Sequence, residues 1–291
     1  MKDSRVLLRE SGLAPKKSFG QNFLVDAHAV QSIARASVPD AEVGRAIVVE
    51  LGAGLGALTA ELLARGRHVI AVERDRDLVP VLASTFADEV EKGALAIQEA
   101  DAKTIDLATI FQMAGEGESR VLCGNLPYQI TGALIERAVQ SAAFIDRAVF
   151  MVQREVADRL LASPSSKEYG ALTVFTRAAF DVRRVLNVGR GCFYPSPDVT
   201  STVVEFVPCR PARAAETDTF RALVKGAFGT RRKTLRNAWS SLGGERIARA
   251  AESAGIDLGL RGETLDVTAF ARMTVALDAI SEGATDDGSG Y

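Results

Sequence analysis

The chain has 291 residues, 47% of them hydrophobic, and a net charge of −2, which suits one large domain with a smaller one. It has no apolar run near the roughly 18 residues of a membrane span and no apolar signal segment at its start, which argues against a membrane or secreted protein. Three cysteines without CxxC spacing and only two histidines argue against a disulfide framework, a metal site and a histidine-based triad, and they predict a cytoplasmic location.

Strand-like and helix-like segments alternate through the first two hundred residues. Apolar strands separated by helices indicate a parallel sheet covered on both faces, which predicts an α/β fold. Two further helical segments and a closing pair of strands complete this part. The strands are expected at residues 46–51, 68–73, 94–101, 119–125, 147–153, 181–188 and 201–207.

The composition changes after Val207, where "PCRPARAAETD" has the character of a linker and only helical patterns follow. We therefore expect an α/β domain over residues 1–208 and a small all-α domain over residues 209–280. Residues 281–291 are small, polar and acidic, and are expected to be a disordered tail. Residues 210–280 carry 12 Lys and Arg against 8 Asp and Glu, and this local positive charge is compatible with phosphate contacts.

The segment "VVELGAGLGALT" predicts a strand, a glycine turn and the start of a helix. Glycines at 52, 54 and 56 permit a tight turn that a ligand can approach closely. Glu73 ends the next strand, where a carboxylate accepts hydrogen bonds from ribose hydroxyls, and Asp101 ends the third strand. The GxGxG spacing without a pyrophosphate motif favours S-adenosylmethionine over NAD. Asp101 can alternatively be a plain helix cap.

The segment "GNLPY" follows the fourth strand, so Asn125 is expected beside Gly52, Glu73 and Asp101. Adenine N6 is a poor nucleophile, and it needs acceptors for its two amino hydrogens more than it needs a strong base. The Asn125 side chain and the backbone carbonyl before Pro127 can supply them, and Tyr128 offers a stacking face. A capped β–α turn is the alternative.

Seven segments occur in order from about residue 10 to 280: "KKSFGQNFLVD", "VVELGAGLGALT", "VIAVERD", "EADA", "GNLPYQIT", "CFYPSPDVTSTVV" and "FGTRRKTLRNAW". Together they resemble the ribosomal RNA adenine N6-dimethyltransferase family, and specifically its small-subunit (16S) members. The resemblance implies a class I, Rossmann-like methyltransferase fold and transfer of four methyl groups from S-adenosylmethionine to two adjacent adenosines near the 3′ end of 16S rRNA.

The same resemblance assigns the site residues. Asn125 and Tyr128 would be the catalytic residues, with Leu126 and Pro127 also at the target base. Gln129 departs from the asparagine frequent in the family, and we expect it to change only fine positioning. The cofactor contacts would be Asn22, Leu24, Gly52, Glu73, Asp101 and Asn125.

Three further segments suggest contacts with substrate or cofactor. The basic, aromatic stretch around Lys16 and Lys17 can fold over the cofactor as a lid with its lysines facing phosphate, or it is a solvated arm. Phe193 in the stiff "FYPSP" segment is a second stacking face or a hydrophobic plug. A basic helix start is expected to contact RNA phosphates, although such a run is often only a solvated face. Its residues are Arg231, Arg232, Lys233 and Arg236.

The expected partner is 16S rRNA or the assembling small ribosomal subunit, with the protein acting as a monomer that uses no metal. Three alternatives stay open. A methyltransferase acting on large-subunit rRNA would share the cofactor and NLPY motifs. A ribosome-assembly factor or a transcription-factor relative would bind RNA or DNA with little methylation. An NAD oxidoreductase is disfavoured by GxGxG and NLPY.

Overall fold

The computed structural model describes residues 4–112, 115, 117–230 and 232–282, which form two compact units. The first unit runs to Ala157 and includes Val182–Pro208. The second contains Asp158–Asp181 and the chain from Cys209 onward. The predicted boundary at residue 208 coincides with one junction, whereas residues 158–181, predicted in the first domain, lie in the second unit. Their Tyr169 and Val174 belong to the same hydrophobic cluster as the C-terminal helices, and this packing places them in the second unit.

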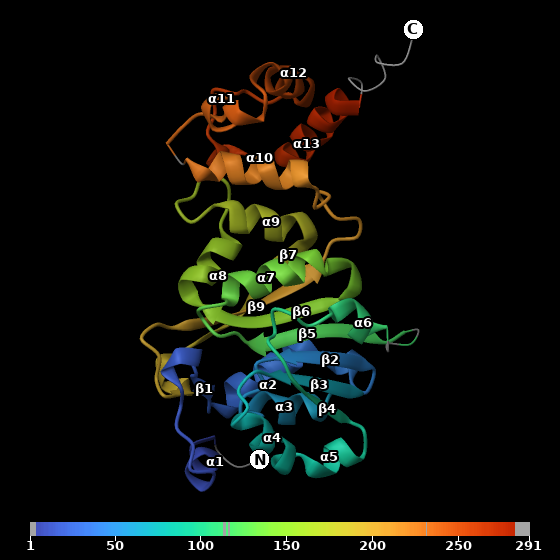
Figure 1. Ribbon diagram of the computed structural model, residues 1–291, viewed down its shortest axis with the longest axis vertical. Helices are drawn as coiled ribbons and strands as arrows, with labels where there is room; N and C mark the ends of the chain where they lie inside the picture. The colour runs from blue at the N-terminus through green and yellow to red at the C-terminus, as the bar shows by residue number, and fades with distance from the viewer. Residues whose placement is uncertain (1–3, 113–114, 116, 231, 283–291) are drawn as a thin grey trace. The chain divides into compact units, whose positions relative to one another are not determined.

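A seven-stranded sheet in the order β4-β3-β2-β5-β6-β9-β7 forms the centre of the first unit (Figure 1). The strands from β4 to β6 are parallel, and β9 pairs antiparallel with β6. A separate two-stranded sheet joins β1 to β8. The strands are β1 (Phe23–Leu24), β2 (Ala46–Leu51), β3 (His68–Glu73), β4 (Leu95–Glu99), β5 (Ser119–Asn125), β6 (Arg147–Gln153), β7 (Phe180–Val188), β8 (Phe193–Tyr194) and β9 (Ser201–Pro208).

The parallel strands β2, β3, β5 and β6 match the predicted apolar runs because both of their faces are mostly buried, whereas β4 at the edge of the sheet exposes Gln98 and Glu99. All six residues of β2 are buried, as are the five central residues of β6. The helices in this part of the chain, several of which join the strands, are α1 (Ser4–Glu10), α2 (Ala27–Ser37), α3 (Ala57–Leu63), α4 (Leu78–Thr85), α5 (Ala87–Glu91), α6 (Leu107–Phe111), α7 (Thr131–Gln140), α8 (Arg154–Leu161) and α9 (Ala171–Ala179).

The order of the strands determines where a ligand can bind. From the central strand β2 the chain proceeds through β3 to β4 at one edge, and it then returns to the other side of β2 to form β5 and β6. Right-handed crossovers in opposite directions place α3 and α7 on opposite faces of the sheet. The carboxyl ends of β2 and β5 therefore border the crevice where the strand order reverses, which is the usual ligand site of such sheets.

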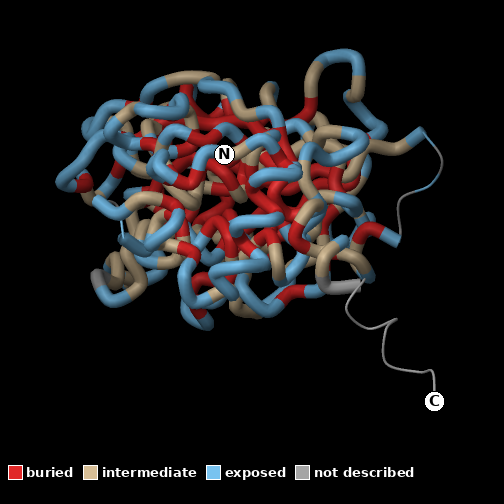
Figure 2. The backbone as a smooth tube through the Cα atoms, turned by 90° about the horizontal axis from the view of Figure 1, so that it is seen from above, coloured by how far each residue is buried: buried red, intermediate tan, exposed pale blue. Residues whose placement is uncertain are grey.

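Helices α2 and α3 pack on one face of the sheet, in a cluster with Ile33, Leu62, Val48 and Val121. Buried positions concentrate in the interior of the chain, with exposed positions around them (Figure 2). Burying this apolar surface provides the main favourable free energy of folding. A buried carboxylate, Glu205 of β9, is compensated within this unit by ion pairs.

The second unit is helical around a core that contains Trp239, whose indole Nε1 donates to the Leu223 carbonyl oxygen at 2.8 Å. The basic helix start predicted around Arg232 differs in the structure, because Arg232 and Lys233 precede the helix and only Arg236 lies within it. The backbone amides of Leu235 and Arg236 donate to the carbonyls of Leu260 and Leu258, so this segment pairs with a distant loop. The C-terminal helices are α10 (Asp218–Gly229), α11 (Leu235–Ala238), α12 (Gly244–Ala254) and α13 (Val267–Glu282).

Six short 3-10 helices are also described: η1 (Lys17–Phe19), η2 (Asp40–Glu42), η3 (Ala142–Phe144), η4 (Arg190–Cys192), η5 (Ser240–Leu242) and η6 (Gly262–Thr264).

The predicted disordered tail begins at residue 281, but α13 continues to Glu282, and residues 283–291 lie outside the described part. None of the described helices combines the length and apolar content needed to cross a bilayer.

Candidate functional site

The glycine turn after β2 is held by a carboxylate from the neighbouring strand. Gly52, Gly54 and Gly56 have φ angles of 77°, 58° and 84°, in the left-handed region that favours glycine. The Gly54 amide donates to Glu73 Oε2 at 2.8 Å, and the Asp75 amide donates to Glu73 Oε1 at 2.8 Å. Each carboxylate oxygen retains a further lone pair, so Glu73 can fix the turn and accept ligand hydroxyls simultaneously.

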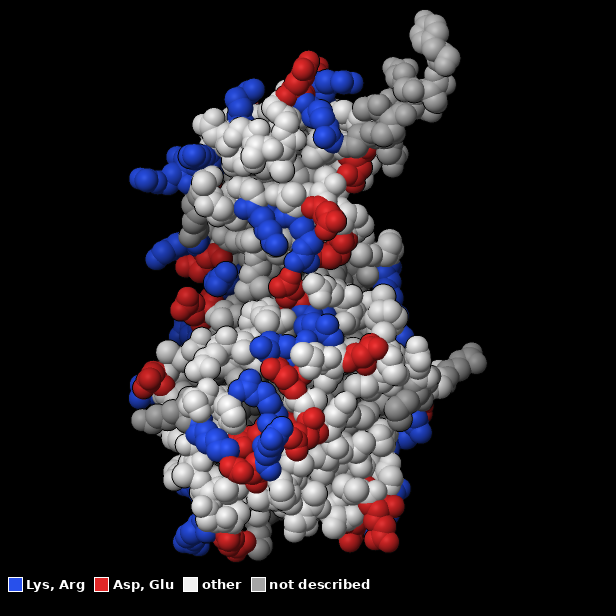
Figure 3. Space-filling view, in the orientation of Figure 1, with Lys and Arg blue, Asp and Glu red and all other residues white. Residues whose placement is uncertain are grey.

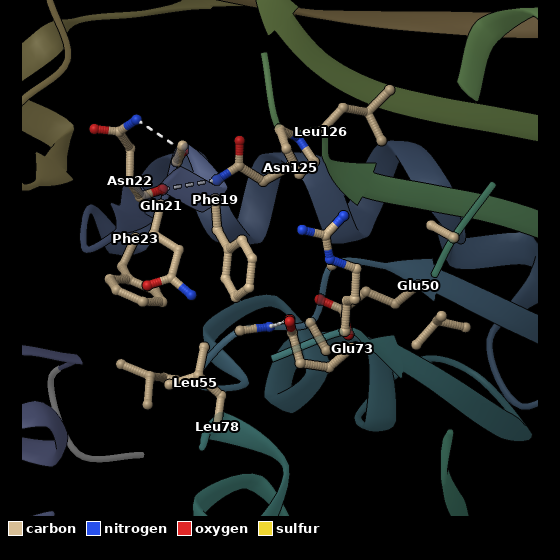
Figure 4. Close-up of a pocket in the computed structure, with 18 of the residues that line it drawn as sticks. Phe19, Gln21, Asn22, Phe23, Glu50, Leu55, Glu73, Leu78, Asn125 and Leu126 are labelled. Atoms are coloured by element: carbon tan, nitrogen blue, oxygen red, sulfur yellow. Dashed lines mark hydrogen bonds between the residues drawn. The ribbon is translucent and has the colours of Figure 1, made fainter. Parts of the chain in front are cut away.

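One cavity lies at this turn, at the carboxyl ends of the parallel strands (Figure 4). In this view Asn22 and Asn125 lie above Glu73, Leu55 and Leu78. The cavity brings together the cofactor and base residues predicted from the sequence, although they come from segments a hundred residues apart. They are Asn22, Leu24, Gly52, Glu73, Asp101, Asn125, Leu126, Pro127 and Tyr128.

Asp101 lines the cavity without capping a helix, so the cap interpretation was wrong. Its Oδ1 accepts the Lys103 amide at 3.0 Å within a turn, while Asp106 caps α6. Burial alone would raise the pKa of Asp101, but the Lys103 amide and the positive charges of Lys103 and Arg74 outweigh it and lower the pKa. The carboxylate is therefore ionised and can accept a hydrogen bond from an amino group.

The backbone of "GNLPY" is fixed on both sides. A Cβ on Gly124 would lie 2.3 Å from the Leu51 carbonyl oxygen, so only glycine fits where β5 passes β2. The Leu126 amide donates to the Met151 carbonyl of β6 at 3.1 Å. Within the described part of the chain, the carbonyl oxygen of Leu126 accepts no hydrogen bond. It therefore remains available as an acceptor beside the cavity.

The side-chain amide of Asn125 has a defined orientation. Its Nδ2 donates to the backbone carbonyl of Asn22 at 3.0 Å, shown by a dashed line in Figure 4. A carbonyl oxygen can only accept, so the nitrogen must face Asn22, and Oδ1 is left to accept from another donor. Tyr128 is half-buried beside it, and its hydroxyl lies 2.8 Å from Ser201 Oγ. Burial raises the pKa of Tyr128, which stays protonated at neutral pH.

A strap formed by residues 16–24 lies at the cavity, and its anchoring was not predicted. Lys16 Nζ contacts the carboxylates of Asp75 at 2.5 Å and Asp77 at 2.6 Å, so this lysine does not face outward to phosphate as expected. Gln21 Nε2 donates to Asp75 at 2.7 Å. Arg74 stacks on Phe19 with its guanidinium carbon 4.5 Å from the ring centroid. These contacts connect the strap to the loop after β3.

Glu50 also lines the cavity and was missed in the sequence because it lies within an apolar strand. Its side chain is buried and accepts a hydrogen bond from Thr59 Oγ1 at 2.6 Å. Burial, with a smaller contribution from the negative charge of Glu73, raises the pKa of Glu50 to about 8. Glu50 is therefore largely protonated at pH 7. The signal that could have identified it is an acidic residue among five apolar ones.

Phe193 does not line the cavity. It is 5% exposed and packs in the core cluster with Leu24, so the structure favours the hydrophobic plug over the stacking face. Its cross-strand neighbour is Leu24, while Tyr194 pairs with Phe23 and remains exposed. An exposed aromatic therefore does lie in "FYPSP", but it is the residue after the predicted one.

The predicted phosphate contacts belong to the second unit. Arg232, Lys233 and Arg236 are exposed, and none of them forms an ion pair within the described residues. Lys and Arg side chains are visible over the region of α11 and α12 in Figure 3. Arg231 and the side chain of Lys17 lie outside the described part. Among the described residues, no group of three or more His, Cys, Asp or Glu side chains could hold a metal ion.

Comparisons with known proteins agree with this geometry. The sequence model described as "Ribosomal RNA adenine dimethylase" matches residues 12–278. "Ribosomal RNA small subunit methyltransferase A" of Anaeromyxobacter sp. (strain K) is 44% identical over 279 residues, covering 92% of this chain and 95% of that protein. The protein of the same name from Myxococcus xanthus is 40% identical, covering 97% of each.

Two solved structures share the fold. The dimethyladenosine transferase of Plasmodium falciparum has a TM-score of 0.73 at 22% identity, covering 89% of this chain and 98% of that one. The 23S rRNA methyltransferase ErmE has a TM-score of 0.64 at 24% identity, covering 88% and 100%. The fold is that of a class I methyltransferase, and the chain belongs to the ribosomal RNA adenine dimethylase family.

Proposed function

We propose that this protein transfers methyl groups from S-adenosylmethionine to N6 of two adjacent adenosines near the 3′ end of 16S rRNA, during assembly of the small ribosomal subunit. The name of the relatives that are 40–44% identical supports the small subunit as the substrate. We further propose that it acts as a monomer in the cytoplasm, without a metal. Three free cysteines suit a reducing compartment.

The cavity fits the cofactor by its donors and acceptors. Glu73 has lone pairs left for ribose hydroxyls, Asp101 can accept from an adenine amino group, and the turn at Gly52 permits close approach. Asn22 and Leu24 of the strap would cover the ligand from the opposite side. When bound, S-adenosylmethionine supplies an electrophilic methyl group on a sulfonium, and the thioether leaves as S-adenosylhomocysteine.

The orientation of Asn125 is the observation that carries this proposal. With Nδ2 bonded to Asn22, Oδ1 can accept one N6 hydrogen, and the Leu126 carbonyl can accept the other. Two acceptors direct the nitrogen lone pair out of the ring plane toward the methyl group and stabilise the positive charge that develops on N6. In each transfer one N6 proton is released to solvent after the C–N bond forms. Tyr128 would stack on the base and hold it in this position.

The test is methylation of small subunits purified from a strain that lacks this protein, with mass mapping of the methylated adenosines. We expect four methyl groups on two adjacent adenosines near the 3′ end of 16S rRNA. Asn125→Ala should lower the single-turnover rate by about 10²-fold or more. Gln140→Ala, at an exposed position at the end of α7 that does not line the cavity, is the control and should retain most of the rate.

Methylation of large subunits in the same assay would support the alternative substrate. ErmE shares the fold at 24% identity, so the likeness alone does not distinguish the two substrates. If neither subunit is methylated but both the protein and its Asn125→Ala variant bind small subunits equally, an assembly factor would be the better description, and the proposed chemistry would be wrong.

A further inference from the structure

The hydroxyl of Tyr128 has a partner outside the "GNLPY" segment. Its oxygen lies 2.8 Å from Oγ of Ser201, which is 73 residues further along the chain. Ser201 is the first residue of β9 and is fully buried, whereas Tyr128 is half-buried at the cavity. Either hydroxyl can donate to the other. The bond therefore joins a side chain that lines the cavity to a rigid part of the sheet.

Ser201 is held in place by strand pairing. It lies opposite Gln153 of β6, while Met151 of the same strand pairs with Val203. The carbonyl of Met151 also accepts the Leu126 amide at 3.1 Å. The segment that contains Asn125 and Tyr128 is thus connected to the β6–β9 ladder both through its backbone and through the Tyr128 hydroxyl.

The hydrogen bond of the Tyr128 hydroxyl restricts a side-chain rotation that the backbone bond of Leu126 still allows. The backbone bond fixes the position of the segment, but rotation about the side-chain bonds of Tyr128 would still change the plane of its ring. A hydrogen bond at the far end of the ring, to a buried partner, restricts that rotation. A stacking residue is effective only when its ring lies parallel to the base, so the orientation of the ring bears directly on the reaction.

We propose that Ser201 is a positioning residue for methyl transfer, acting through the hydroxyl of Tyr128 to hold the ring in the orientation that stacks the target base. This rests on the proposed function, because it assumes that Tyr128 contacts the adenosine. Ser201 itself contacts neither substrate nor cofactor, and it is absent from the residues that line the cavity. Its effect should therefore depend entirely on the presence of the Tyr128 hydroxyl.

The experiment is a double-mutant cycle with Ser201→Ala, Tyr128→Phe and the variant that combines them. Single-turnover methylation of small subunits is measured at saturating S-adenosylmethionine, together with cofactor affinity and thermal melting. Each single variant should lose about three- to tenfold in rate, the range for one hydrogen bond, with unchanged cofactor affinity. The combined variant should be no slower than Tyr128→Phe, because no bond remains to be lost.

Two more variants separate positioning from stability. Ser201→Thr retains the hydroxyl and suits a strand, so it should restore most of the rate that Ser201→Ala loses. Thr202→Val is the matched control, since it removes a buried hydroxyl from the next residue of β9, whose partner is Asn187 Oδ1 at 3.0 Å. It should alter thermal stability without altering the rate.

Three results would overturn the inference. They are a wild-type rate in well-folded Ser201→Ala protein, a further loss when Ser201→Ala is added to Tyr128→Phe, and an equal rate loss in Thr202→Val. Tyr128→Ala distinguishes this failure from failure of the proposed function. A large rate loss in Tyr128→Ala with none in Ser201→Ala refutes only the role of Ser201. A normal rate in Tyr128→Ala refutes the base pocket, and the role of Ser201 with it.

Discussion

Replacing Glu73 by alanine tests the cofactor site most directly, because the carboxylate connects the glycine turn to β3. The variant removes the acceptor proposed for the ribose hydroxyls, a charged hydrogen bond of about 1.5–3 kcal/mol, which corresponds to roughly 10- to 150-fold in the dissociation constant of S-adenosylmethionine. It also removes the acceptor of the Gly54 and Asp75 amides. We therefore expect weaker cofactor binding together with lower stability.

Glu99 supplies the matched control. It is paired in register with Glu73 on β4, but it is half-exposed, forms an ion pair with Arg76 at 2.9 Å, and does not line the cavity. Glu99→Ala should therefore bind the cofactor normally. Glu73→Gln should recover little of the cofactor affinity that Glu73→Ala loses, because the NH₂ group of the glutamine would face one of the two backbone N–H donors.

The assay combines calorimetric titration with unfolding in the presence of ligand. At a concentration 100 times the wild-type dissociation constant, S-adenosylmethionine should stabilise the wild-type protein by about 2.7 kcal/mol. A 100-fold weaker Glu73→Ala variant should gain only about 0.4 kcal/mol. A folded Glu73→Ala variant whose affinity stays within about twofold of wild type would refute a contact between Glu73 and the cofactor.

The remaining predictions concern a buried acid, the RNA contacts and the strap. Between pH 4.5 and about 8 the folded protein retains a proton on Glu50 that the unfolded chain has lost, so its unfolding free energy should fall as pH rises, by up to about 1.4 kcal/mol per pH unit. Glu50→Gln should lack this slope in urea unfolding at pH 6, 7 and 8, and parallel pH profiles would contradict the assignment. Replacing Arg232 and Arg236 by Glu should flatten the salt dependence of subunit binding by about one to two units of slope, with cofactor affinity unchanged, and an unaltered slope would make them a solvated face. Lys16→Ala should accelerate release of S-adenosylmethionine in stopped-flow measurements, and an unchanged release rate would mean that the strap does not retain the ligand.

The sheet and the cavity rim were predictable because their signals are local. Parallel strands buried on both faces appear as continuous apolar runs, and residues after those runs must meet at one edge. These signals predict that Gly52, Glu73, Asp101 and Asn125 lie together, and all four line the cavity. The same reasoning does not identify Glu50 as a site residue, because a single acidic residue in an apolar strand has no periodicity that predicts its partner.

The contacts of the strap and the start of α11 were not predictable for a different reason. Lys16 is 59 residues from Asp75, and both lie in irregular segments where neither helical nor strand periodicity fixes a direction. Phe193 and Tyr194 are adjacent aromatics, and which of them is buried depends on pairing between β1 and β8. Helix α11 begins only at Leu235, where the amides of Leu235 and Arg236 pair with carbonyls of a loop more than twenty residues away.

The side-chain amide of Asn125 connects the strap to the proposed base pocket. Its two ends have opposite hydrogen-bonding character, so the donor end must be occupied before the acceptor end has a defined direction. The occupant is the backbone of Asn22, adjacent to the Phe23–Leu24 strand that pairs with β8. If the strap were displaced from the cavity, the side-chain amide of Asn125 could rotate. The N6 amino group of the base would then face Nδ2, a donor, as often as Oδ1, an acceptor. On the proposed mechanism, the strap that would cover the cofactor therefore also directs the Asn125 acceptor toward the target base.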